Sequence, residues 1–195
     1  MPTISHFARE LRWYSNQGCV HPGPLPLHPS TGLGSWLLDS GSLTAKLLKL
    51  SQGDFKVQVL RQVHGRASRS EALALGIGFH ARCLIREVIL RGHDQPWVFA
   101  RSVLPLSSLT GSLRHLRKQG TRPLGAFLFS HPHLKRSPIA LALISGHHCY
   151  LPAALLGSDP VWGRRSIFSL DDKPLLVSEV FLPDFSSAIK SAIIE

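Results

Sequence analysis

The alternation of apolar and polar residues predicts five strands, four of which pair as two hairpins. The predicted strands cover residues 55–63, 81–91, 97–104, 164–170 and 174–182. The first alternates regularly, and the second and third are rich in β-branched residues. A short polar segment before Pro96 separates the second strand from the third, and Asp171 and Asp172 separate the last two. Both connections are short enough for antiparallel hairpins.

Apolar residues at helical spacing predict four helices around these strands. The predicted helices cover residues 7–14, 36–48, 109–118 and 123–129. The second is interrupted near Gly41, and Ser42 or Thr44 is expected to cap its second part. The fourth begins with a proline, which suits the first turn of a helix, and has Thr121 near its cap. Residues 18–34 contain four prolines and predict an extended connector.

The order of helices and strands indicates the α+β class, with an antiparallel sheet flanked by helices. We expect one domain over residues 1–195, of which residues 1–35 form a Pro-rich N-terminal segment. A chain of this length buries a substantial core.

Composition narrows the kind of protein. Lys and Arg number 22 against 12 Asp and Glu, which gives a formal charge of +10, while hydrophobic residues make up 44% and exclude a disordered chain. The positive charge is compatible with three kinds of partner, which are a nucleic acid, an anionic membrane surface and a small anionic ligand. The three cysteines are widely spaced, which is typical of a protein in a reducing compartment. No apolar run is long enough for a signal peptide or a membrane span, so we expect a cytoplasmic protein without stable membrane insertion.

Strand alternation places two charges on apolar strand faces. Arg86 shares a face with Leu84, Val88 and Leu90, and Glu179 lies in the same way among apolar residues of the last strand. A buried charge needs a partner or a ligand. Two interpretations stay open at this point. The charges form structural ion pairs, or they line a closed pocket in which Arg86 holds a ligand carboxylate and Glu179 meets a hydroxyl group.

Other polar clusters give weaker signals. The eleven histidines include residues 131 and 133 and the run 147–148 beside Cys149, but no zinc-site spacing occurs, so no metal is predicted. Residues 114–118 form a basic helical face without interleaved aromatic residues, which is typical of a solvated surface, and no nucleic-acid partner is expected.

An ordered set of segments resembles the chorismate lyase family. The segments are WLLDSGSLTAKL (36–47), LIREVIL (84–90), QPWVFARSVLP (95–105), RPLGAFLF (122–129), VWGRRSIF (161–168) and KPLLVSEVFLP (173–183). The resemblance covers most of the chain from Trp36 to Pro183. No single segment is decisive, but their common order and spacing are specific.

The resemblance implies a cofactor-independent lyase that removes pyruvate from chorismate and leaves 4-hydroxybenzoate, the entry to ubiquinone synthesis. It also implies one α+β domain, expected here as a monomer, with an internal ligand pocket under helical flaps and inhibition by the product. The family's carboxylate-binding arginine falls on Arg86, and its hydroxyl-binding glutamate falls on Glu179. These two would be catalytic, and the flap residues Leu43 and Leu124 would join them in binding the substrate.

Two departures from the family pattern stand out. The family often has Met where this chain has Leu43, a replacement that nearly conserves volume. Residues 140–160 are predicted to be a loop insertion before the WGRRS strand.

The second carboxylate of chorismate also needs a binding group, for which Arg101, Arg164, Arg165 or a backbone amide are candidates. The alternative function is a non-catalytic effector-binding domain of related fold, although the first 35 residues do not fit a DNA-binding helix-turn-helix.

Overall fold

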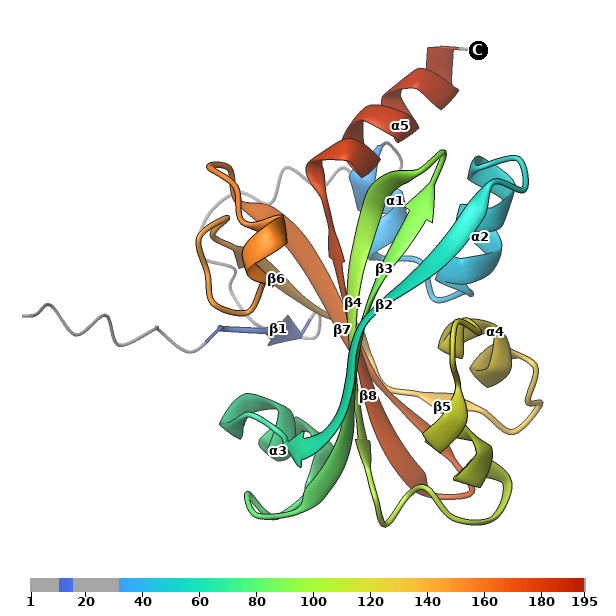
Figure 1. Cartoon of the computed structure of the whole chain (residues 1–195), viewed down its shortest axis with the longest axis vertical. Coiled ribbons are helices and arrows are strands. Elements are labelled where there is room, and N and C mark those ends of the chain that lie inside the picture. Colours follow the sequence, from blue (N-terminus) through green and yellow to red (C-terminus); the bar gives the residue numbers. More distant parts are fainter. Residues whose placement is uncertain (1–10, 16–31, 195) are drawn as a thin grey trace, which may run out of the picture.

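One twisted antiparallel sheet organises the chain (Figure 1). The computed structural model describes residues 11–15 and 32–194. Seven strands follow one another in the order β1-β6-β7-β8-β4-β3-β2, and β5 pairs with β7. The strands are β1 (Tyr14–Ser15), β2 (Phe55–Arg66), β3 (Arg82–Gly92), β4 (Gln95–Pro105), β5 (Lys135–Arg136), β6 (Ala140–Ile144), β7 (Val161–Leu170) and β8 (Lys173–Phe181). All of these pairings are antiparallel, as predicted.

Both predicted hairpins are confirmed. Strands β3 and β4 meet at His93 and Asp94, and β7 and β8 meet at Asp171 and Asp172. All four turn residues have positive φ angles, between 50° and 57°. Two consecutive left-handed residues give a turn whose twist matches that of the paired strands. The register places Arg86 opposite Ser102, and Ala100 opposite Glu179, so these side chains share one sheet face.

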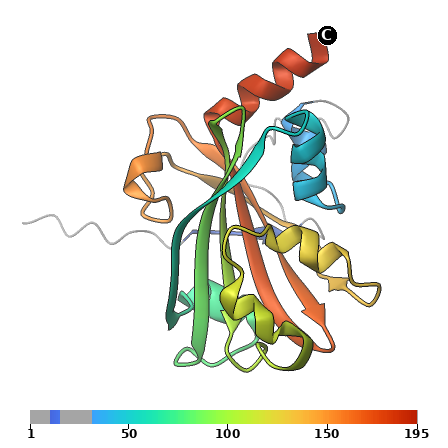
Figure 2. The same ribbon diagram turned by 45° about the vertical axis from the view of Figure 1, so that its right-hand side comes forward.

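Helices lie on both faces of the sheet (Figures 1 and 2). They are α1 (Leu33–Leu37), α2 (Leu43–Leu50), α3 (Arg69–Leu75), α4 (Leu124–Phe129), α5 (Pro183–Ile194) and the 3-10 helices η1 (Gly111–Lys118) and η2 (Ala153–Leu155). Helices α1, α2 and α4 cover the sheet face that carries Arg86 and Glu179, and α3 packs on the opposite face. None of the described helices is long and apolar enough to cross a bilayer.

Local sequence explains the boundaries of α2 and α3. Ser42 caps α2 by accepting a hydrogen bond from the Ala45 amide, as predicted. Ser68 and Glu71 form a reciprocal capping box at the start of α3, and left-handed Gly76 ends that helix. The serine-to-glutamate spacing was a usable signal for α3, which the apolar spacing did not reveal.

The structure corrects several predicted boundaries. Tyr14 belongs to β1 and not to a helix, because it pairs with Leu141, while residues 7–10 lie outside the described residues. Helix α1 begins at Leu33, so the end of the predicted connector is helical, and the rest of that connector is not described. Helix α4 begins at Leu124, so Pro123 is its N-cap and not its first residue. Residues 140–144 of the predicted loop form β6, which pairs with β7.

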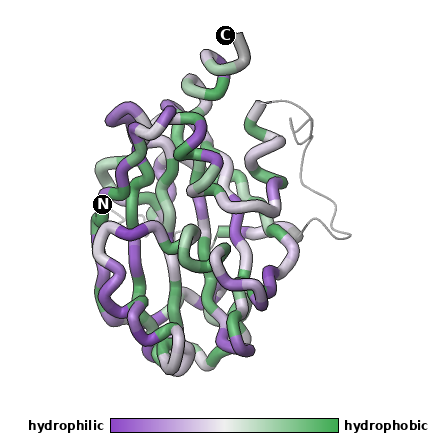
Figure 3. The backbone as a smooth tube through the Cα atoms, turned by 90° about the vertical axis from the view of Figure 1, so that its right-hand side faces the viewer, coloured by the Kyte–Doolittle hydropathy of each residue, from purple (hydrophilic) through white to green (hydrophobic). Residues whose placement is uncertain are grey.

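Each sheet face buries its own charges. Figure 3 shows hydrophilic positions among hydrophobic ones along the backbone. On the α3 face, Arg101 bonds the carboxylate of Glu71, with 2.7 Å between its Nε and Oε1, and also pairs with Glu87. Arg61 joins the network by donating two hydrogen bonds to Glu87. Burial alone raises the pKa of Glu71, but the hydrogen bonds and charge of Arg101 outweigh it, so that pKa lies below its ordinary value.

The lowered pKa of Glu71 predicts a pH-dependent contribution to stability. The contribution is complete above the ordinary pKa of 4.5 and is lost as the pH falls toward the folded-state value. We expect Glu71→Gln to lower the free energy of unfolding by about 1–3 kcal/mol at neutral pH, with the difference shrinking below the ordinary pKa. Urea unfolding across this range measures it, and exposed Asp159→Asn is the control. A difference that does not change with pH would contradict the assignment.

Candidate functional site

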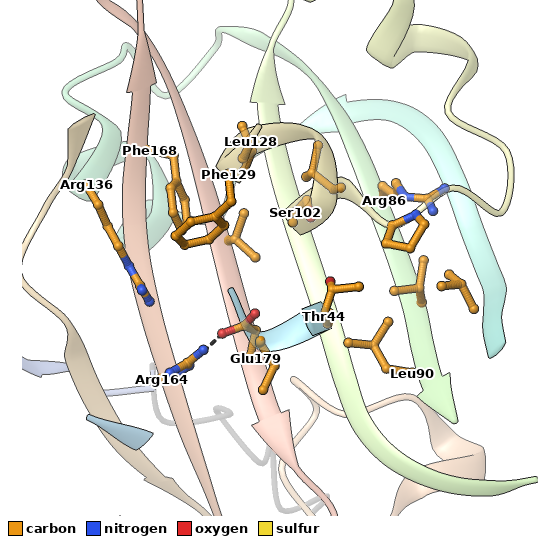
Figure 4. Close-up of a pocket in the computed structure, with 18 of the residues that line it drawn as sticks. Thr44, Arg86, Leu90, Ser102, Leu128, Phe129, Arg136, Arg164, Phe168 and Glu179 are labelled. Carbon is orange, nitrogen blue, oxygen red and sulfur yellow. Dashed lines mark hydrogen bonds and ion pairs between the residues drawn. The ribbon is translucent and has the colours of Figure 1, made fainter. Parts of the chain in front are cut away.

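A cavity lies between the sheet and the helices α2 and α4 (Figure 4). The cavity is partly enclosed and partly open to solvent. Its polar lining comes from Thr44, Arg86, Ser102, Arg136, Arg164 and Glu179. Its apolar lining includes Leu43, Val57, Val88, Leu90, Leu124, Leu128, Phe129, Phe168 and Val177. All four residues that the resemblance assigned to the site therefore line one cavity.

Arg86 lies on one side of this cavity, on β3, the strand next to the edge strand β2. Its Nη1 donates to Gly120 O at 2.7 Å and Gln62 Oε1 at 3.1 Å, and its Nη2 donates to Arg122 O at 3.3 Å. None of the described carboxylates forms an ion pair with it. Burial lowers the pKa of Arg86, yet a guanidinium stays charged at neutral pH. The cavity thus contains a cation whose charge is not balanced by a described neighbour.

Glu179 lies on the other side of the cavity and pairs with Arg164 of the adjacent strand. The distance from Arg164 Nε to Glu179 Oε2 is 2.6 Å. Arg164 is 1% exposed, and its Nη1 also donates to Trp36 O at 2.6 Å and Asp39 O at 2.8 Å. The second carboxylate oxygen of Glu179 has no hydrogen bond to a described residue. The interpretation as an ion pair and the interpretation as a pocket are therefore compatible, because Glu179 takes part in both.

Arg136 is a third cavity cation, which sequence reasoning missed. It belongs to the two-residue strand β5, and its guanidinium stacks 5.0 Å from the centre of the Phe168 ring. Its Nε donates to Ser166 Oγ at 3.0 Å, and its Nη1 donates to Ser40 O at 2.7 Å. Burial lowers the pKa of Arg136, and the charge of Arg164 lowers it further. A basic residue in a short irregular segment gave no periodic signal.

Of the arginines suggested for a second carboxylate, only Arg164 lines the cavity. Arg101 points to the opposite face, where it binds Glu71 and Glu87. Arg165 also points there, and its Nη1 donates to Ser70 Oγ of α3 at 2.9 Å. Strand alternation explains both outcomes, because Arg101 follows the cavity residue Ala100 and Arg165 follows Arg164. Within the described residues, no three His, Cys, Asp or Glu side chains gather to form a possible metal site.

Leu43 and Leu124 come from the first residues of two helices that close the cavity. Both are buried, at 4% and 9% exposure. Gly125 explains the Pro-Leu-Gly segment, because a Cβ atom at that position would lie 2.9 Å from Thr44 Oγ1 on α2. Only glycine lets α4 approach α2 this closely without a shift. The two helix starts thus meet over the cavity with apolar side chains beneath them.

The fold and the cavity define a class: an α+β protein with a partly enclosed pocket that three described arginines line. The chorismate lyase family model matches residues 25–190. A probable chorismate pyruvate-lyase of Methylococcus capsulatus is 43% identical over 161 residues, which cover 81% of this chain and 99% of that protein. A protein of the same name from Pseudomonas fluorescens is 39% identical, covering 86% of this chain and 93% of its own length. The chain belongs to the chorismate lyase family.

Solved structures of similar fold come from bacterial regulators. The effector domain of PhnF from Mycobacterium smegmatis has a TM-score of 0.54 and 21% identity, covering 75% of this chain and 91% of that domain. The C-terminal domain of a histidine utilization repressor from Pseudomonas syringae has a TM-score of 0.52 and 16% identity, covering 67% and 92%. At such identities the likeness concerns the fold alone, and it agrees with the predicted α+β class.

The close approach of α4 to α2 is testable by substitution of Gly125. We expect Gly125→Ala to separate the helices and raise amide hydrogen exchange in both by about tenfold, because the added methyl group overpacks the contact. Hydrogen exchange followed by mass spectrometry measures this. The double variant Gly125→Ala, Thr44→Ala removes the atom that the new methyl group meets, and should restore much of the protection. Unchanged exchange in the single variant would show that the contact does not hold the helices together.

Proposed function

We propose that this protein converts chorismate into 4-hydroxybenzoate and pyruvate. The observation that carries the proposal is the charge of the cavity lining, to which the described residues contribute three arginines, Arg86, Arg136 and Arg164, and one carboxylate, Glu179. A buried excess of positive charge is costly unless an anion neutralises it. Chorismate carries two carboxylates, and relatives sharing about 40% of their residues with this chain are named for its cleavage.

The placement of Arg86 and Glu179 suits the two ends of the ring. Their strands are separated by β4, so their backbones lie roughly 10 Å apart across the sheet and two residues apart along it, because Arg86 shares its row with Val177. Both side chains project into the space between, which suits a benzoate-sized ring. In this proposal Arg86 binds the ring carboxylate, and the free oxygen of Glu179 accepts a hydrogen bond from the 4-hydroxyl. Leu43 and Leu124 cover the ring, and the apolar lining excludes water from it.

The chemistry needs little from the protein beyond geometry and charge. The bond between ring carbon 3 and the ether oxygen breaks, carbon 4 loses its hydrogen, and the ring becomes aromatic. The hydrogen passes to the methylene carbon of the enolpyruvyl group, either directly or through a protein group, which yields pyruvate. Aromaticity supplies the driving force, while the fixed cations hold the reacting conformation and stabilise the departing carboxylate. No cofactor is required for this balance of atoms.

The product and its use are part of the proposal. We expect 4-hydroxybenzoate to enter ubiquinone synthesis and to inhibit the enzyme, because a ring held under closed helices leaves slowly. The alternative, a non-catalytic effector-binding domain, shares the fold but predicts ligand binding without turnover.

A direct assay tests the proposed function. Purified protein mixed with chorismate should give equal amounts of 4-hydroxybenzoate, followed by its absorbance, and pyruvate, followed with lactate dehydrogenase. Arg86→Gln should weaken binding of 4-hydroxybenzoate by about 10- to 100-fold, because a charge-assisted hydrogen bond pair is lost. Lys135→Gln, which removes an exposed charge paired with Asp172, is the control. Binding of chorismate without turnover by the wild type would favour the effector-binding alternative.

The role of Glu179 is tested by its amide variant. Because the enolpyruvyl methylene can accept the hydrogen within the substrate, we propose that Glu179 orients the 4-hydroxyl and is not a base. Glu179→Gln keeps an oxygen acceptor, so kcat should fall by no more than about tenfold. A loss of about 10²- to 10⁴-fold in a variant that still binds 4-hydroxybenzoate normally would identify a general base instead, since normal binding shows that the loss of the ion pair with Arg164 has not disrupted the site. Single-turnover measurements exclude product release as the cause.

A further inference from the structure

Two cavity arginines lie side by side around one backbone carbonyl. The Nη1 atoms of Arg136 and Arg164 both donate to Asp39 O, at 3.4 and 2.8 Å. Figure 4 shows both guanidinium groups on the Glu179 side of the cavity, away from Arg86. Arg164 pairs with Glu179. The charges of Glu179 and Asp39 also act on Arg136, but Asp39 itself pairs with Lys46 at 3.4 Å, so the two arginines and Glu179 keep one positive charge in excess.

Donors remain available in this group. Arg136 uses Nε for Ser166 and Nη1 for the carbonyls of Asp39 and Ser40, and Arg164 uses Nε for Glu179 and Nη1 for two carbonyls. The Nη2 group of each makes no hydrogen bond to a described residue. Two guanidinium groups held close together repel each other, and an anion between or beside them removes that cost.

The substitution pattern of the ring puts the second carboxylate in this place. The enolpyruvyl ether is on ring carbon 3, next to the carbon that bears the 4-hydroxyl. If Glu179 binds that hydroxyl, the neighbouring ether must lie beside Glu179, far from Arg86. The cavity cations beside Glu179 are Arg164, which pairs with it, and Arg136, which shares the Asp39 carbonyl with Arg164.

We propose that Arg136, together with Arg164, binds the enolpyruvyl carboxylate of the substrate. The inference rests on the proposed function and adds a residue that sequence reasoning did not find. It also gives the charge of the lining a meaning, since three guanidiniums and one carboxylate leave two positive charges for a substrate with two carboxylates. 4-Hydroxybenzoate keeps only the ring carboxylate, so Arg136 should contribute to the binding of chorismate and not to that of 4-hydroxybenzoate.

The test compares substrate and product binding in Arg136→Gln. We expect KM for chorismate to rise by about 10- to 100-fold, as for the loss of a charge-assisted contact. The dissociation constant of 4-hydroxybenzoate, measured by calorimetry, should change by less than about threefold, because this molecule lacks the carboxylate that Arg136 is proposed to bind. Arg136→Lys should recover part of the loss in KM, and Lys135→Gln should behave as the wild type.

A second probe removes the need for turnover. An aromatic dicarboxylate, 4-hydroxybenzoate carrying a 1-carboxyethyl ether at carbon 3, should bind the wild type more tightly than the same ether with a neutral amide in place of the added carboxylate. Arg136→Gln should reduce that preference by about tenfold or more, because Arg164 remains as the second cation. An unchanged preference would contradict the inference.

The failures of the two proposals differ. A wild type without turnover would contradict the proposed function, whatever the variant does. If the wild type is active, two results for Arg136→Gln would contradict the inference. The variant could leave KM for chorismate unchanged, or it could weaken the binding of 4-hydroxybenzoate as much as that of chorismate. The latter result would mean that Arg136 only supports the loop at Asp39 and Ser40.

Discussion

The buried ion pair between Arg164 and Glu179 is the contact on which the site depends. It joins β7 to β8 inside the sheet, and the same arginine binds the carbonyls of Trp36 and Asp39 at the end of α1 and in the segment before α2. One side chain therefore positions both the carboxylate in the cavity and the segment that leads into the covering helix. A charge at 1% exposure is tolerated only because these acceptors replace its water.

The sheet separates two systems of charge that alternate along the same strands. On the α3 face, Arg101 is balanced by two carboxylates and contributes to stability. On the cavity face, Arg86 and Arg136 have carbonyl and amide or hydroxyl oxygens as partners but no described carboxylate. Neutral acceptors satisfy hydrogen bonds without cancelling charge, so this face retains a field directed at an anion. The difference between a structural and a binding arginine lies in that remaining charge.

The surplus of ten positive charges has two origins. Two of them are in the cavity lining, where they suit a dianion. Most of the rest are on surfaces such as the basic face of η1, whose Arg114, Arg117 and Lys118 are exposed. A positive surface raises the local concentration of a small anion and speeds its arrival. Composition alone pointed equally to larger polyanions, and the cavity favours the smaller ligand.

The sequence by itself determined the α+β class, both hairpins, the break at Gly41 and the unusual faces of Arg86 and Glu179, because strand periodicity and capping are local properties. Apolar spacing alone did not find α3, which a capping box defines, or β6, a short strand in the predicted loop. Only the tertiary structure showed that Arg164 pairs with Glu179 and that Arg136 lines the cavity. It also showed that Arg101 and Arg165 lie on the opposite sheet face. Those contacts join segments up to 128 residues apart, as between Arg164 and Trp36. No local pattern encodes such a distance, because it is set by how the strands pair and the helices pack.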